Sequence, residues 1–204
     1  MDFRLYFRSR QGEMVHLLKQ MVALESPTND KKAVDACALF TARELKKVGC
    51  KVTTHPQKDI GELTVAEFAP GRVKDADDEI LVLTHIDTVW PVGKIGKMPF
   101  YIQGNRLYGP GVLDMKAGVV VLLTALRALH GLNVKPQKKI TIFVNSAEET
   151  GSNAAADLIL SLVTTRIKEA EQIGEAGRKM AMDVFSHERW ARDWESFLTK
   201  EVFK

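Results

Sequence analysis

Two short apolar runs, separated by one long apolar segment, constrain the fold of this chain more than any other feature. The runs span residues 80–83 and 140–144, and each pattern predicts a strand buried on both faces. Residues 115–129 are apolar at nearly every position, which predicts an interior helix. A strand, a helix and a second strand in this order favour parallel pairing. The predicted fold is therefore of the α/β class, with a mostly parallel sheet flanked by helices.

Weaker patterns predict the remaining elements. Apolar residues recur at helical spacing over 14–22, and Ser26-Pro27 ends that pattern. A second helix is predicted over 30–48, with Gly49 in the place of a C-terminal cap. Residues 50–54 and 63–68 predict strands, and residues 98–108 predict a short hairpin.

Ionisable side chains follow both buried strands, at the edge where ligands collect in open α/β sheets. His85 and Asp87 come after the first strand, and Glu148 and Glu149 after the second. Asp114 lies between the turn 109–111 and the apolar segment. A hydrolytic metal pair needs imidazoles, anionic oxygens and one carboxylate that bridges both ions.

These residue types allow a division of roles. His85 is a candidate ligand, and Asp87 can accept its second ring N–H. Asp114 suits the bridging position, because a poorly solvated carboxylate needs cations to compensate its charge. Glu149 can bind metal while Glu148 accepts a proton.

Each motif also has a purely structural interpretation. A histidine and an aspartate at a strand end can be a loop hydrogen-bond pair, and Asp114 can be a helix N-cap. Two adjacent glutamates can be a solvated turn. The occurrence of all three motifs, in this order and at strand ends or turns, favours a two-metal hydrolytic site.

Three segments carry a resemblance to a known family: THIDTV (84–89), LYGPGVLDMKAG (107–118) and SAEETGS (146–152). Over about residues 13–160 the chain resembles the co-catalytic zinc peptidases, which include aminoacylases, glutamate carboxypeptidases and acyl-amino-acid deacylases. Pro110 stands where the deacylase branches usually carry arginine. The resemblance therefore favours the glutamate carboxypeptidase branch.

The resemblance implies a role for each candidate. His85 binds one of two zinc ions, Asp114 bridges both, Glu149 binds the other, Glu148 is the general base and Asp87 orients His85. The implied reaction is hydrolysis of an amide or peptide bond next to a free carboxylate in a small peptide. Deacylation of an N-acyl amino acid is the alternative within the family.

Two further ligands of the family have no clear match in this sequence. One is an acidic residue after the glutamate pair, and the other is a histidine beyond a dimerisation domain. Glu171, Glu175 and His187 lie in unlike surroundings, in segments predicted to be helical. We therefore expect an incomplete metal site. The competing hypothesis is a non-catalytic remnant that binds metal weakly or serves in assembly.

The last part of the sequence has a different character. Residues 173–178 and 184–186, with the tryptophan-bearing helix after them, resemble the C-terminal end of a retaining nucleotide-sugar glycosyltransferase. That segment is structural in its family, so it implies no glycosyl transfer. We predict a hydrolase-like domain over 1–161 and a helical tail of different origin over 162–204.

Composition limits the partners and the location. The net charge is +3 with basic and acidic residues intermixed, which gives no argument for nucleic acid or a membrane as partner. Residues 1–14 are charged and lack the apolar run of a secretory signal, so a cytoplasmic location is predicted. Cys37 and Cys50 are predicted to be buried free thiols. A homo-oligomer remains open.

Overall fold

The structure, a computed structural model, describes residues 3–69 and 79–163. The chain divides into two compact units, 1–157 and 158–204, and the fold below is that of the first. An irregular turn over Val112–Lys116 precedes α4, and α5 begins in the first unit and ends in the second. In chain order the helices and strands are α1 (Phe3–Ser9), α2 (Gln11–Ala23), α3 (Lys31–Lys47), β1 (Lys51–His55), β2 (Leu63–Phe68), β3 (Glu79–His85), a helical turn (Lys94–Gly96), β4 (Tyr101–Gln103), β5 (Arg106–Tyr108), α4 (Ala117–Gly131), β6 (Lys139–Asn145) and α5 (Asn153–Val163).

Four strands form the main sheet, in the order β1-β2-β6-β3. β3 and β6 are parallel, as the strand–helix–strand pattern predicts, whereas β2 runs antiparallel to both β1 and β6. The α/β class is confirmed, but this sheet is mixed rather than mostly parallel. The reason is the short connection between β1 and β2, because a parallel neighbour would need a long crossover.

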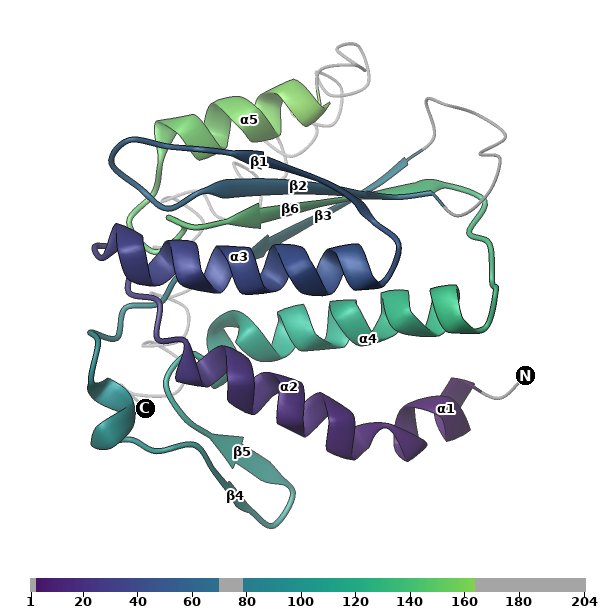
Figure 1. Ribbon diagram of the computed structural model, residues 1–204, viewed down its shortest axis with the longest axis horizontal. Helices are drawn as coiled ribbons and strands as arrows, with labels where there is room; N and C mark the ends of the chain where they lie inside the picture. The colour runs from purple at the N-terminus through teal and green to yellow at the C-terminus, as the bar shows by residue number, and fades with distance from the viewer. Residues whose placement is uncertain (1–2, 70–78, 164–204) are drawn as a thin grey trace, which may run out of the picture. The chain divides into compact units, whose positions relative to one another are not determined.

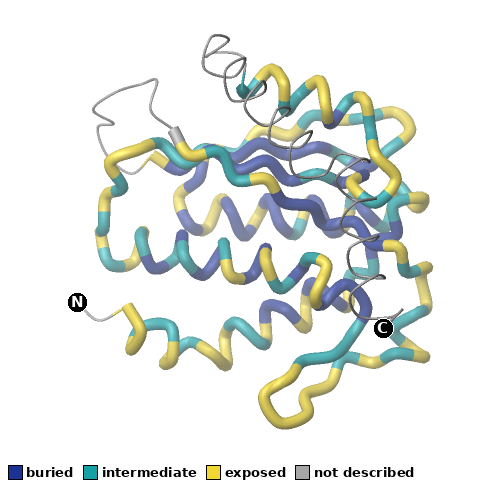
Figure 2. Tube along the Cα trace, turned by 180° about the vertical axis from the view of Figure 1, so that it is seen from behind, coloured by how far each residue is buried: buried dark blue, intermediate teal, exposed yellow. Residues whose placement is uncertain are grey.

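Helices α3 and α4 lie along one face of the sheet, and α2 packs beside α4 (Figure 1). The buried residues gather on the strands and on the helix faces turned toward them (Figure 2). Asp30 caps α3 by accepting a hydrogen bond from the backbone N–H of Ala33. Gly49 has φ +87 just after α3, so the predicted C-terminal cap is confirmed. The predicted hairpin is also confirmed, as β4 and β5.

The expectation of two strands buried on both faces is right for β6 and wrong for β3. Phe143 and Val144 of β6 are each 1% exposed, whereas Ile80 and Leu83 of β3 are 46% and 52% exposed. The difference follows from position, since β3 is the last strand of the described sheet and β6 is flanked on both sides. Apolar sequence alone does not distinguish the two situations.

The long apolar segment also differs from its prediction. Helix α4 begins at Ala117 rather than at residue 115, because Asp114 and Met115 have non-helical backbone angles. Val121 is 58% exposed, so α4 is not interior on every side. Both cysteines are buried and free, as predicted.

Several predictions fall on residues 164–204, which lie outside the described residues. These are Glu171, Glu175 and His187 as poorly matched ligands, the glycosyltransferase-like segments and the helical tail. Within the described ranges no helix is long and apolar enough to cross a membrane.

Candidate metal centre

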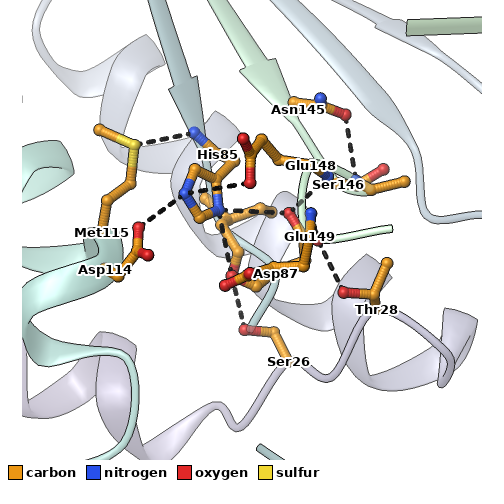
Figure 3. Close-up of polar contacts among 12 residues, drawn as sticks. Ser26, Thr28, His85, Asp87, Asp114, Met115, Asn145, Ser146, Glu148 and Glu149 are labelled. Atoms are coloured by element: carbon orange, nitrogen blue, oxygen red, sulfur yellow. Dashed lines mark hydrogen bonds and ion pairs between the residues drawn. The ribbon is translucent and has the colours of Figure 1, made fainter. Parts of the chain in front are cut away.

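The candidate ligands come from three separate parts of the chain that meet at one edge of the sheet. Parallel pairing sets His85 of β3 opposite Asn145 of β6, so the loops after both strands leave from the same edge. Asp114 arrives from the turn that precedes α4. One ligand atom each from His85, Asp114 and Glu149 can be chosen so that all lie within 4.8 Å of one another (Figure 3).

The imidazole of His85 presents its two nitrogens to different groups. Nδ1 lies 3.2 Å from the backbone carbonyl of Asp87 and 3.4 Å from its carboxylate, so Nδ1 carries a proton and donates it. Nε2 lies 3.0 Å from Asp114 Oδ1 and 3.9 Å from Glu148 Oε2. The nitrogen that a metal would use therefore faces the other candidate ligands.

Asp87 does more than the sequence suggested. Its side chain is fully buried and accepts hydrogen bonds from the backbone N–H groups of Glu148 (3.2 Å) and Glu149 (3.1 Å) and from the hydroxyl of Thr28 (2.7 Å). Burial would raise the pKa of Asp87, but the hydrogen bonds from His85, Thr28 and the two backbone amides lower it. One carboxylate thus connects the histidine with the turn that carries both glutamates.

The remaining carboxylates face outward. The side chains of Asp114 and Glu148 are 72% and 56% exposed. Burial would lower the pKa of His85, but the hydrogen bond and charge of Asp87, with Asp114 and Glu148, raise it to about 9. Burial and the charge of Asp114 raise the pKa of Glu149.

The charge distribution fits a cation among these side chains. The carboxylates destabilise one another's charge, and a proton on His85 is the counter-charge available among the described residues of the cluster. One imidazole and several carboxylate oxygens are donors that zinc accepts. A metal would take over the role of that proton, since a ligating histidine must be neutral.

A cleft of about 390 Å³ opens beside the candidate ligands. Asp114 and Glu149 contribute to its lining, and the other side chains of the lining are mainly apolar, among them Trp90 and Met98. Both carboxylates therefore border a space of the size of ligand pockets.

Backbone constraints hold the turn before Asp114. Gly111 has φ +67, and a Cβ there would lie 2.6 Å from Thr88 Cγ2. A side chain larger than hydrogen at residue 111 would therefore disturb the loop after β3.

The segment before the glutamates is also held in place. The Ser146 hydroxyl donates to the carbonyl of Gly61 at 2.6 Å.

Two residues near the site were absent from the sequence-based list. Lys116 is 1% exposed, and its Nζ donates to the carbonyl of Met21 at 3.0 Å. A lysine at the start of an apolar segment is a signal that could have been used. Thr28 had no such signal, because 59 positions separate it from its partner Asp87.

Comparison with known proteins decides the family. Residues 81–185, about half of the chain, match Peptidase family M20/M25/M40. The chain belongs to this family. The predicted peptidase family is thereby confirmed, and both zinc as the metal and the glycosyltransferase resemblance of the tail stay predictions.

Two relatives illustrate what this M20 family chain is similar to in sequence. It is 35% identical over 150 residues to carboxypeptidase G2 of Pseudomonas sp. (strain RS-16), and 30% identical over 155 residues to a probable succinyl-diaminopimelate desuccinylase of Staphylococcus aureus. The matches cover 73% and 71% of this chain but 35% of each relative, so the chain spans about a third of their length.

The structural neighbours share the fold. Human carnosine dipeptidase 1 aligns with TM-score 0.67 at 22% identity, covering 77% of this chain and 36% of that one. An M20 family metallo-carboxypeptidase from Sulfolobus solfataricus aligns with TM-score 0.56 at 21% identity, covering 67% and 31%. The α/β architecture is therefore that of M20 peptidases.

Proposed function

We propose that this chain carries the zinc-binding core of a hydrolase that cleaves an amide or peptide bond next to a free carboxylate. The observation that supports it best is the approach of His85, Asp114 and Glu149 to within 4.8 Å of one another. The similarity to carboxypeptidase G2 supports the same class of reaction.

In this proposal His85 Nε2 and the carboxylate of Glu149 would each hold zinc, and Asp114 would be the ligand common to two ions. Bound zinc supplies Lewis-acid chemistry, because it polarises a carbonyl and lowers the pKa of water. Glu148 would accept the proton of the attacking water, and its exposed carboxylate lies 3.9 Å from His85 Nε2. Asp87 orients His85 from the buried side.

The number of donors supports an additional proposal about the site. If Asp114 is shared, each of two zinc ions has two protein ligands among the described residues, whereas a catalytic zinc usually has three. We propose that the further ligands lie outside the described residues. The alternative is a non-catalytic domain that binds metal weakly or serves in assembly.

A second candidate reaction is deacylation of an N-acyl amino acid. The relatives named succinyl-diaminopimelate desuccinylase, at 30% identity, favour it. Both reactions hydrolyse an amide, so the same side chains would serve either one. A substrate panel of N-acyl amino acids and of dipeptides with free carboxylates distinguishes them by which class is cleaved.

Other parts of the proposal rest on sequence. We propose a small peptide or an N-acyl amino acid as substrate, no nucleic acid or membrane partner, a cytoplasmic location and a possible homo-oligomer. We also propose that residues 1–161 form the hydrolase-like domain and that 162–204 form a tail of different origin. None of these follows from the geometry of the metal centre.

Metal content separates the enzyme from the non-catalytic domain. We expect the purified chain, supplied with zinc and then freed of unbound ions, to hold about two zinc ions. Elemental analysis measures the ratio. A chain that retains no zinc would rule out the proposed hydrolase.

The adjacent glutamates test the division of roles. Glu148→Gln should lower hydrolysis by about 10²- to 10⁴-fold and leave zinc binding intact, because it removes a proton acceptor and no ligand. Glu149→Gln should lower zinc binding itself. Glu13→Gln, on an exposed helix surface, is the matched control and should change neither property. A wild-type rate of hydrolysis in Glu148→Gln would show that Glu148 is not the general base.

A further inference from the structure

The segment after α2 lies along the loop that follows β3. The hydroxyl of Ser26 donates to the carbonyl of Ile86 at 2.6 Å, and the backbone N–H of Thr88 donates to the carbonyl of Ser26 at 2.8 Å. The backbone N–H of Thr28 then donates to the carbonyl of Thr88 at 3.2 Å. Residues 26–28 are thereby held beside the loop that contains Asp87 and directly follows His85, the last residue of β3 (Figure 3).

This placement brings the hydroxyl of Thr28 to the carboxylate of Asp87. The hydroxyl donates to Asp87 Oδ2 at 2.7 Å, the same oxygen that accepts the backbone N–H of Glu149. Asp87 Oδ1 accepts the backbone N–H of Glu148 and lies 3.4 Å from His85 Nδ1. Each oxygen of one buried carboxylate thus holds a different part of the metal centre.

The orientation of that carboxylate depends on its donors. The side chain of Asp87 is fully buried, so water is poorly placed to replace a lost partner. Among the partners, the Thr28 hydroxyl is the side-chain group that approaches Oδ2, and the others are backbone amides and a ring nitrogen. Loss of this hydroxyl leaves Oδ2 held by the backbone N–H of Glu149, so we expect the carboxylate to be held less firmly against the amides.

We infer that Thr28 is a positioning residue for the metal centre, acting through Asp87 on His85 and on the glutamate turn. The inference rests on the proposed function. Thr28 is not among the candidate ligands and does not line the cleft, so it acts at a distance from the metal and the substrate. Groups outside the ligand shell commonly change metal affinity in this way.

Zinc affinity of the metal-free 204-residue chain, measured by titration calorimetry, tests this role. Thr28→Val keeps the shape of the side chain and removes the hydroxyl, and we expect zinc to bind about tenfold more weakly. Thr28→Ser restores the hydroxyl and should restore the affinity. Thermal melting of each variant reports whether the fold is intact.

A matched control excludes a general effect of replacing a hydrogen-bonded threonine by valine. Thr124 is 2% exposed, and its hydroxyl donates to the carbonyl of Val120 at 2.7 Å within α4. Thr124→Val should leave zinc affinity unchanged. If Thr28→Val does not fold, Thr28→Ala provides a second variant without the hydroxyl.

The outcomes separate this inference from the proposed function. Wild-type affinity in a folded Thr28→Val or Thr28→Ala variant would overturn the role of Thr28 alone. Weak binding by Thr28→Ser would overturn it as well, because the hydroxyl would be present without effect. Absence of zinc binding by the wild-type chain would overturn both proposals.

Discussion

Two aspartates of the candidate metal centre are held in opposite ways. Asp87 is fully buried and its carboxylate accepts hydrogen bonds from two backbone amides and a hydroxyl, whereas the side chain of Asp114 is 72% exposed and lies against His85. On the buried side of the site, both oxygens of Asp87 accept hydrogen bonds. On the open side, the carboxylates of Asp114 and Glu149 line the cleft. The buried hydrogen bonds of Asp87 therefore fix the geometry of the site, whereas the exposed carboxylates remain accessible to a metal or a substrate.

The largest difference in the free energy of unfolding is expected between two variants in which asparagine replaces Asp87 or Asp114. Asp87→Asn should lower the free energy of unfolding by about 2–4 kcal/mol, because its NH₂ replaces one carboxylate oxygen and leaves either the backbone N–H of Glu148 or that of Glu149 without an acceptor. Asp114→Asn should change it by less than about 1 kcal/mol, because an exposed pair contributes little.

Urea unfolding of the metal-free chain measures both values, and zinc titration gives the complementary comparison. Asp114→Asn should weaken zinc binding although the fold is unchanged. Equal loss of stability in the two variants would remove the distinction between the buried and the open side.

A pair of glycines tests how closely the turn before Asp114 approaches its neighbours. Gly111 and Gly93 both have positive φ, but a Cβ at Gly111 meets Thr88 Cγ2 at 2.6 Å whereas a Cβ at Gly93 meets nothing within 4 Å. Gly111→Ala should therefore cost about 2–4 kcal/mol, from strain and overpacking together. Gly93→Ala should cost about 1–2 kcal/mol from backbone strain alone.

Thermal or urea unfolding of the two glycine variants gives the comparison directly. The difference between their free energies of unfolding measures the cost of the close contact with Thr88, since the strain of a positive φ is common to both variants. Similar values would mean that the turn before Asp114 yields as easily as an open loop.

The smallest effect is expected at the two buried thiols. Burial raises the pKa of Cys37 and raises that of Cys50 to about 11. Both should react with a thiol reagent at pH 8 on the order of 100-fold more slowly in the native chain than in urea. Unfolded thiols ionise near pH ~8.5, so the contribution of Cys50 to stability is present below that pH and is lost as the pH rises toward 11.

Reaction rates followed by absorbance, in native buffer and in urea, check this prediction. Fast modification of either cysteine in the native chain would show that the core around that cysteine opens readily.

Much of the arrangement was predictable from local patterns, and its errors have identifiable causes. The two buried strands and the helix between them predicted the parallel pair β3 and β6, and with it the meeting of His85 and the glutamate pair at one edge. The exposure of Leu83 was not predictable, because an apolar strand has the same sequence at the end of a sheet as in its middle. The short connection between residues 50–54 and 63–68 indicates an antiparallel pair, but no local pattern specifies that β2 also pairs with β6.

The sequence by itself determined the family, the α/β class and the list of chemically capable side chains. It could do so because metal-binding chemistry requires particular residue types at strand ends, and those types stand at recognisable positions along the chain. Only the tertiary structure decided that Asp87 holds the glutamate turn as well as His85, and that Thr28 completes its hydrogen bonds. Such contacts join residues 59 to 62 positions apart, and no local pattern specifies which buried donor will meet which acceptor once the chain has folded.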